Sequence, residues 1–277
     1  MTFTRTQSIL KKLLPEACFK LLYNLAYWGY NKWQRILDEI YYLVSYIYYV
    51  LIKDSKNVKK IKIIYSIRPY SMVGRSGLFA TYDIAAGIEK KKVDGSFVEC
   101  GVASGGCSAL MALVANENKS NRKVWLLDSF EGLPAPKVED ELKESVVYKP
   151  KDKRASLLSQ GYCLGIYDEV EKLLFSELSL DRNNVFMVKG WLQDTLPRFK
   201  NEIGGISVLR IDVDWYESTK CCLENLYDNV VAGGYIIVDD YNSVIGCQKA
   251  VDEFLENRNL NLKLIFDGRG GCYFAKP

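Results

Sequence analysis

From residue 95 onward the sequence alternates short apolar segments with helical stretches. Five of these segments lie where strands are expected, and two closing segments follow near the C-terminus: 96–100, 123–127, 185–188, 206–211, 234–238, 262–266 and 272–275. Such alternation is typical of a parallel sheet covered by helices. The sequence therefore predicts an α/β domain, with helices that include 107–116, 167–177 and 244–257.

Aspartates stand where three of the predicted strands end. Asp128 closes the second strand, Asp212 follows the fourth, and Asp239 and Asp240 follow the fifth. In open α/β sheets, ligands bind along the edge formed by the carboxyl ends of the strands. A single aspartate there is equally well explained as a helix cap. Four of them are expected to converge on a shared ligand.

The turn after the first strand is rich in glycine. It reads GVASGG from Gly101 to Gly106, whereas dinucleotide enzymes favour GxGxxG. Glycines let the backbone approach a ligand, and the following helix offers free N–H groups. With Asp128 placed to accept ribose hydroxyls, the turn indicates a nucleoside cofactor smaller than a dinucleotide.

Composition excludes several classes of chemistry. The chain has no histidine, which removes Ser-His-Asp and Cys-His catalysis and histidine-ligated zinc. Its net charge is only +3, without the basic stripe of a nucleic-acid-binding protein, so we expect no nucleic-acid partner. None of the eight cysteines falls in a CxxC pair, which favours reduced cysteines in a cytoplasmic enzyme.

Longer blocks carry a family resemblance. They read DSFEGLPAP at 128–136, KGWLQDTLP at 189–197, and LRIDVDWYEST at 209–219 with GGYIIVDDY at 233–241. From about Met72 to the C-terminus the chain resembles the macrocin O-methyltransferase family, whose members methylate sugar hydroxyls of antibiotics. The resemblance implies a class I methyltransferase (Rossmann-like) sheet, parallel with one antiparallel C-terminal strand and helices on both faces. It also implies S-adenosylmethionine and Mg²⁺ as cofactors.

The resemblance assigns residues position by position. The cofactor-binding positions of the family match Met72, Val73, Glu99, Gly101, Ser108, Asp128, Ser129, Gly190, Trp191, Gln193 and Asp212. The metal ligands match Asp212, Asp239 and Asp240, and the proposed general base matches Asp214, which makes Asp212 and Asp214 the predicted catalytic residues. The turn departs from the family at Ala103 and Ser104, where an aromatic and a basic residue are common.

The residues themselves agree with this chemistry. Carboxylates without histidine favour a hard cation such as Mg²⁺, which polarises a sugar hydroxyl while Asp214 accepts its proton. Asp214 has a second interpretation as the cap of a helix starting near Glu217. The expected function is O-methylation of a sugar or glycan-like hydroxyl. The alternatives are a catechol-like or other diol acceptor, and a non-catalytic, membrane-tethered cofactor-binding protein, which would have no need of the intact aspartate set.

The first 70 residues are expected to form a helical extension to a methyltransferase domain at 71–277. The run Ile40–Ile52 is uncharged but short of the ~20 residues that span a bilayer, and no signal peptide is expected. Two interpretations remain for 17–62. One is a pair of helices packing on the catalytic domain or on a second subunit in a homodimer. The other is peripheral contact with the inner face of the membrane, through tyrosines and through Lys53, Lys56, Lys59, Lys60 and Lys62.

The insertion at 137–161 is rich in Lys and Glu. It predicts either a solvated loop or a mobile lid beside the cofactor edge.

Overall fold

The structure, a computed structural model, describes residues 15–140 and 162–277. By internal contacts the chain divides into two compact units, the first ending at Tyr65 and the second running from Ser66 to Pro277. The expected boundary after residue 70 lies a few residues further on. The lid expected at 137–161 falls largely on 141–161, outside the described residues.

The first unit is a helical hairpin. Helix α2 (Glu16–Leu51) is followed by a short turn and α3 (Ser55–Ile67). Asp54 caps α3 by accepting the amide of Asn57 at 3.0 Å. Buried Tyr42 on α2 meets Tyr65 on α3 edge-on, and Tyr65 Oη donates to Glu39 Oε2 at 3.0 Å. These contacts hold one side of α2 against α3.

Among the helices of residues 15–140 and 162–277, none is both long enough and apolar enough to traverse a bilayer.

The second unit is built on a seven-stranded sheet of order β3-β2-β1-β4-β5-β7-β6. The strands are β1 (Ser96–Cys100), β2 (Val124–Asp128), β3 (Val185–Lys189), β4 (Ile206–Ile211), β5 (Val230–Val238), β6 (Ile265–Phe266) and β7 (Cys272–Ala275). Strands β1 to β5 are parallel, β7 runs antiparallel to β5, and β6 pairs antiparallel with β7. The predicted class I methyltransferase fold is confirmed.

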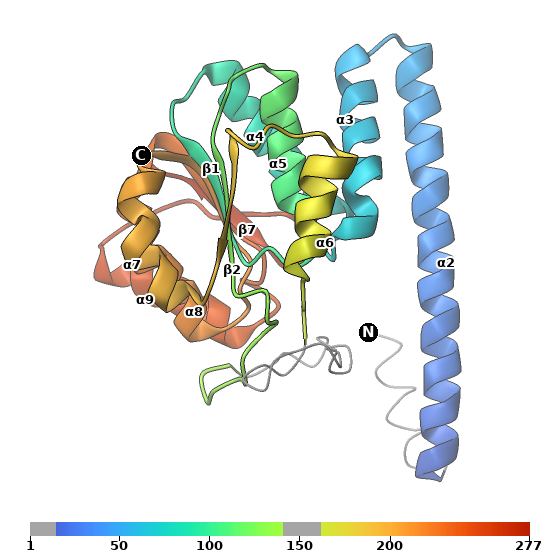
Figure 1. Ribbon diagram of the computed structural model, residues 1–277. Coiled ribbons are helices and arrows are strands. Elements are labelled where there is room, and N and C mark those ends of the chain that lie inside the picture. Colours follow the sequence, from blue (N-terminus) through green and yellow to red (C-terminus); the bar gives the residue numbers. More distant parts are fainter. Residues whose placement is uncertain (1–14, 141–161) are drawn as a thin grey trace. The chain divides into compact units, whose positions relative to one another are not determined.

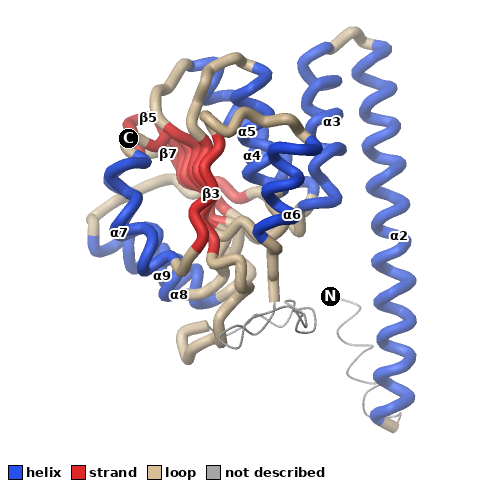
Figure 2. Tube along the Cα trace, viewed as in Figure 1, coloured by secondary structure: helices blue, strands red, loops and turns tan. Residues whose placement is uncertain are grey.

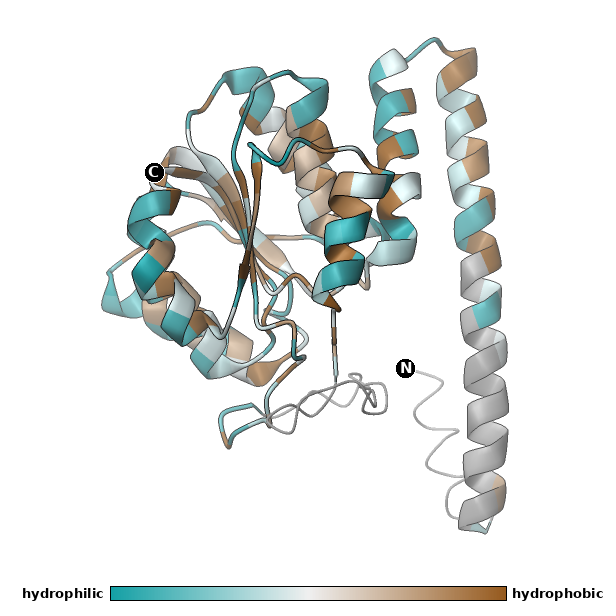
Figure 3. Cartoon of the chain, in the orientation of Figure 1, coloured by the Kyte–Doolittle hydropathy of each residue, from teal (hydrophilic) through white to brown (hydrophobic). Residues whose placement is uncertain are grey.

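Helices cover both faces of this sheet (Figures 1 and 2). On one face lie α4 (Arg75–Lys91), α5 (Gly106–Glu117) and α6 (Tyr167–Glu171), and on the other α7 (Leu192–Ile203), α8 (Tyr216–Leu226) and α9 (Ile245–Asn257). Short 3₁₀ segments lie at Arg68–Tyr70 and Tyr227–Asn229. The strands are mostly apolar and the outer helix faces hydrophilic, as Figure 3 shows, because the sheet is buried between the two helix layers.

Three elements differ from the sequence prediction. The strand expected at 262–266 is confined to Ile265–Phe266. Strand β5 begins at Val230 instead of 234, because the Gly233–Gly234 pair, with Gly233 at φ +76°, marks an irregularity in pairing with β4 and not the start of the strand. The predicted helix 167–177 is α-helical only to Glu171. Its second half, Lys172–Glu177, is a π-helix, in which the amide of Leu178 donates to the carbonyl of Leu173.

Register places the strand ends at one edge. Cys100 at the end of β1 pairs with Leu127 on one side and Ile211 on the other, and Ile211 pairs in turn with Val238. The residues that follow, including Asp212 and Asp239, therefore emerge side by side.

Candidate active site

Three aspartates converge at the ends of β4 and β5. Asp212, Asp239 and Asp240 each offer a carboxylate oxygen, and these atoms lie within 4.8 Å of one another. Oδ2 of Asp240 is buried and has no hydrogen-bond partner among the described residues. An orphaned buried oxygen is costly unless a ligand satisfies it, so an oxygen-loving cation fits this donor set.

A buried arginine within β4 holds this cluster together. Arg210 is fully buried, and its Nη2 donates to Asp212 Oδ2 and to Asp239 Oδ1, both at 2.8 Å. Its Nε donates at 3.0 Å to Oε1 of Glu99 on β1. Sequence reasoning missed Arg210, although an isolated charge inside the apolar segment ISVLRI was the available signal, because such a charge must be paired when buried.

The acids strongly perturb one another. Burial, followed by the charge of Asp239, raises the pKa of Asp212 well above its ordinary value. Burial, followed by the charge of Asp214, does the same for the pKa of Asp240. Burial also raises the pKa of Glu99 to about 7, against the opposing effect of Arg210. Carboxylates gathered in this way disfavour one another's ionised forms, which a divalent cation would reverse.

The glycine-rich turn at 101–106, which follows β1, packs directly against Asp212, the residue that follows β4. The amide of Asp212 donates to the carbonyl of Cys100 at 2.9 Å, and Gly101 adopts φ +83°. A Cβ atom on Gly101 would lie 1.8 Å from the carbonyl oxygen of Asp212, so no larger residue fits there.

Asp128 closes the same turn from β2. Its Oδ2 accepts the amides of Val102 at 2.6 Å and Ala103 at 3.1 Å, and its Oδ1 accepts the amide of Phe130 at 2.7 Å. Burial nevertheless raises the pKa of Asp128. The carboxylate thus fixes the turn, and Asp128 also lines the cavity described next.

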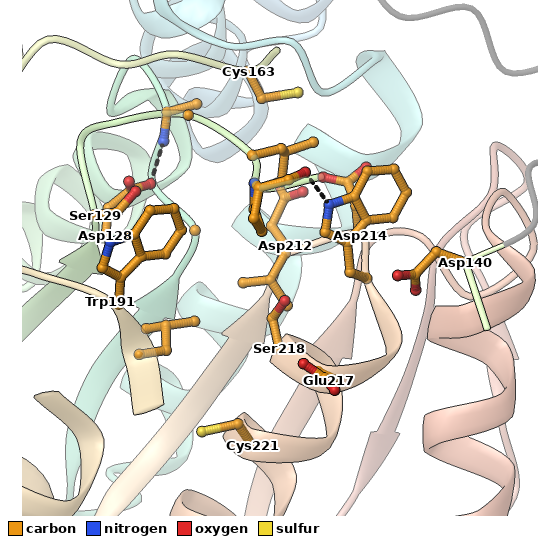
Figure 4. Close-up of a pocket in the computed structure, with 18 of the residues that line it drawn as sticks. Asp128, Ser129, Asp140, Cys163, Trp191, Asp212, Asp214, Glu217, Ser218 and Cys221 are labelled. Carbon is orange, nitrogen blue, oxygen red and sulfur yellow. Dashed lines mark hydrogen bonds between the residues drawn. The ribbon is translucent and has the colours of Figure 1, made fainter. Parts of the chain in front are cut away.

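A cavity of about 550 Å³ opens at this edge of the sheet. In Figure 4, Asp128, Ser129 and Trp191 lie on one side of it, and Asp212 and Asp214 on the other. The residues predicted for cofactor or catalysis that line it are Met72, Gly101, Asp128, Ser129, Trp191, Gln193, Asp212 and Asp214.

The other predicted residues lie behind this lining. They are Val73, Glu99, Ser108, Gly190, Asp239 and Asp240, which do not line the cavity. Ser108 Oγ donates to Glu99 Oε2 beneath the turn, and Gly190, at φ +147°, leads from β3 to Trp191. Met72 is tied through its carbonyl to Arg269 Nη2 at 3.0 Å.

Asp214 sits in a strained turn between β4 and α8. Its φ is +58°, a region that non-glycine residues seldom adopt. The N-cap residue of α8 is Trp215, without a side-chain cap bond, and the amide of Tyr216 donates to Asp140 Oδ1 at 2.6 Å. The cap of this helix is therefore supplied by Asp140, and strain at a cavity-lining acid is typical of a functional position.

Residues 134–140, which precede the segment 141–161, form a further wall of the cavity. Trp215 Nε1 donates to the carbonyl of Pro134 at 3.0 Å, and Lys137 forms an ion pair of 2.5 Å with Glu217. With the Asp140 bond, these contacts attach 134–140 to the start of α8. The sequence did not predict this wall. It also did not predict Cys163, which lines the cavity. Burial raises the pKa of the Cys163 thiol, which keeps the thiol neutral.

Comparisons with known proteins agree with this geometry. Residues 66–276 match the macrocin-O-methyltransferase (TylF) family. The chain is 33% identical over 208 residues to demethyldecarbamoylnovobiocin O-methyltransferase of Streptomyces niveus, covering 75% of this chain and 76% of the relative. It is 26% identical over 210 residues to mycinamicin III 3''-O-methyltransferase of Micromonospora griseorubida, covering 75% and 78%.

Solved structures show the same relationship. The O-methyltransferase NovP is 33% identical, with a TM-score of 0.63 over 75% of this chain and 82% of that one. The calicheamicin methyltransferase CalS11, at 18% identity and a TM-score of 0.56 over 80% and 93%, shares the fold. Residues 1–65 lie outside the range that the family match covers.

Proposed function

This chain belongs to the macrocin O-methyltransferase family and is an S-adenosylmethionine-dependent O-methyltransferase, and we propose that it methylates a hydroxyl of a sugar or glycan-like acceptor with the help of Mg²⁺. The relatives' names support this acceptor class, since one of them is a 4'-O-methyltransferase of a rhamnosyl tetracenomycin. The orphaned Oδ2 of Asp240 is the single observation that carries the metal requirement.

Each proposed metal ligand keeps a carboxylate oxygen that Arg210 does not bind. Arg210 occupies one oxygen each of Asp212 and Asp239, and the second oxygen of Asp239 lies 3.7 Å from Nη1 of the partly exposed Arg269. Together with Asp240 these atoms form an all-oxygen set, which suits Mg²⁺ better than zinc or copper. A bound Mg²⁺ would polarise the acceptor hydroxyl and lower its pKa.

The protein's own residues then carry the transfer. We assign Asp128, Ser129, Trp191 and Gln193 to the nucleoside side of the cavity and the wall at 134–140 to the acceptor. Asp214 accepts the hydroxyl proton as the oxygen bonds to the methyl carbon, and the carbon–sulfur bond breaks to leave the thioether. An in-line approach at about 3–3.5 Å makes positioning the main contribution to the rate.

The test is turnover with a panel of sugars and one catechol, in EDTA and after Mg²⁺ is restored. We expect EDTA to lower product formation at least ~100-fold and Mg²⁺ to recover it. S-adenosylhomocysteine should still bind in EDTA by calorimetry, because Asp128, Ser129, Trp191 and Gln193, which are assigned to its nucleoside, lie at the ends of β2 and β3 and not among the metal ligands.

A matched pair of variants sharpens the test. Asp240→Asn should abolish the Mg²⁺ response, whereas Glu224→Gln, which removes an exposed carboxylate on α8, should retain it. Undiminished turnover in EDTA would refute the metal requirement, and turnover of the catechol alone would refute the sugar acceptor.

A further inference from the structure

Helix α2 carries a regular row of exposed apolar side chains. Trp33, Leu37, Ile40, Val44, Ile47 and Leu51, here called the α2 seam, are spaced by four and three residues in strict alternation. Each is between 42% and 74% exposed. The same spacing continues upstream in the sequence through Tyr30, Ala26, Tyr23 and Phe19. This is the a/d pattern of a coiled coil, sustained for more than four heptads.

The side of α2 that faces away from the seam contacts α3, while apolar residues beside the seam, among them Ile36 and Val50, are exposed as well. Its charged residues between Lys32 and Glu39 all fall at heptad positions away from the seam. Tyr42 and Glu39, on that other side, contact Tyr65 of α3. Within the hairpin, therefore, α3 takes one side of α2 and leaves the seam uncovered.

We propose that the α2 seam pairs with the α2 seam of a second copy of this chain. The spacing favours a second helix, and not a lipid surface, as the binding partner of the seam. A repeat of 3.5 residues drifts by about 20° per heptad on a straight helix, and it stays in register only when two helices coil around each other. A membrane surface imposes no such repeat.

The size of the contact is adequate. Helix α2 has 36 residues, and at ~1.5 Å per residue it offers about 54 Å of length. At roughly 60–100 Å² per apolar side chain, the six seam residues of two helices would bury about 720–1,200 Å². The upper end of that range reaches the size at which stable protein–protein interfaces begin. The pairing lies outside the family-matched range and does not depend on the proposed reaction.

Sedimentation velocity of the full chain across a range of micromolar concentrations tests the pairing. Two adjacent residues supply a matched pair of variants, since Val44 on the seam and Leu43 beside it are exposed to 59% and 60%. Val44→Glu buries an unpaired carboxylate from each copy, which should weaken the dimer at least ~100-fold. Leu43→Glu places the same charge at a flanking position, where glutamate is common in coiled coils, and should change the dimer constant by less than ~10-fold.

The outcomes separate the pairing from its rivals. A dimer lost in Val44→Glu and kept in Leu43→Glu, with S-adenosylhomocysteine binding intact in both, supports the proposal. A wild-type monomer, or a dimer that resists Val44→Glu, overturns it. Flotation of a monomer with vesicles of equal parts phosphatidylcholine and phosphatidylglycerol, lost alike in both variants, would assign the face to lipid and also overturn the proposal.

Discussion

Two regions of this protein reverse the usual partition of residues, and they do so in opposite directions. At the sheet edge, Arg210 is fully buried among carboxylates, whereas along α2 the apolar Leu51 is 74% exposed. Charged side chains are seldom buried, and regular rows of large apolar side chains are seldom exposed. Each reversal carries a free-energy cost that something outside the chain can offset. At the sheet edge the proposed cation would offset the repulsion among the carboxylates that surround Arg210, and along α2 the proposed second helix would cover the exposed apolar row.

The largest expected effect is a loss of kcat at the sheet edge with ligand binding retained. Asp214→Asn should lower kcat by about 10²–10⁴, because the hydroxyl loses its proton acceptor. Binding of S-adenosylhomocysteine and of Mg²⁺, measured by calorimetry, should be nearly unchanged. Near-normal turnover with metal still bound would remove Asp214 from the base role.

The buried arginine provides the largest effect on stability. Arg210→Met leaves Glu99, Asp212 and Asp239 without their shared cation, so the free energy of unfolding should fall by about 3–5 kcal/mol in urea without metal. Arg182→Met removes an exposed pair with Glu171 and should cost less than about 1 kcal/mol. Equal losses in the two variants would mean that burial of the Arg210 network contributes nothing.

Glu99 should make stability depend on pH. Its pKa rises from an ordinary 4.5 to about 7 in the folded chain, so the folded state holds the proton more tightly than the unfolded one. The stability contributed by this group is therefore full below pH 4.5 and is lost as the pH rises toward 7. Urea unfolding at fixed Mg²⁺ should show this decline in the wild type, and Glu99→Gln should flatten it. An unchanged slope in the variant would contradict the assignment.

A smaller loss of stability is expected from a substitution at Asp140, in the cavity wall at 134–140. Asp140→Ala removes the acceptor of the Tyr216 amide and should cost about 1–2 kcal/mol of stability. The neighbouring Glu139→Ala is the control and should cost less than half as much. KM for the acceptor should rise in Asp140→Ala alone, because 134–140 is attached to α8 through this bond. Equal KM values in Asp140→Ala and Glu139→Ala would mean that the wall does not contribute to acceptor binding.

The smallest effect belongs to α2. Leu51→Gln, studied well below the dimer constant, should change the free energy of unfolding by no more than about 0.5 kcal/mol, since the side chain is mostly exposed. Thermal unfolding of dilute protein provides the measurement. A loss of 2 kcal/mol or more would show that the chain itself covers the seam, and the contrast between the two regions would disappear.

The sequence revealed the sheet and its acids because both depend on local pattern. The apolar segments set the strands, and parallel strands bring Asp128, Asp212 and Asp239 to one edge whatever the details of packing. The partners of Arg210 could not be predicted, since they depend on the register of β1, β4 and β5 together. The cap supplied by Asp140 was equally hidden, because the residue lies 76 positions before the amide that it binds.

The seam shows a different limit. Its spacing is visible in the sequence, yet the sequence left open whether residues 17–62 pack as a pair of helices or contact a membrane. Which face of α2 stays uncovered depends on α3, and so only the structure distinguishes the seam from the side that carries Tyr42.

The contact of Gly101 with the carbonyl of Asp212 has a consequence for how such an enzyme can diversify. The turn proposed to bind the methyl donor and Asp212, a proposed metal ligand, are in direct backbone contact, so a change in either would shift the other. The wall at 134–140, by contrast, is joined to the site through Trp215, Tyr216 and Glu217 at the start of α8. On the proposed assignment, a change of acceptor would require changes in that wall, whereas the turn and Asp212 would have to change together.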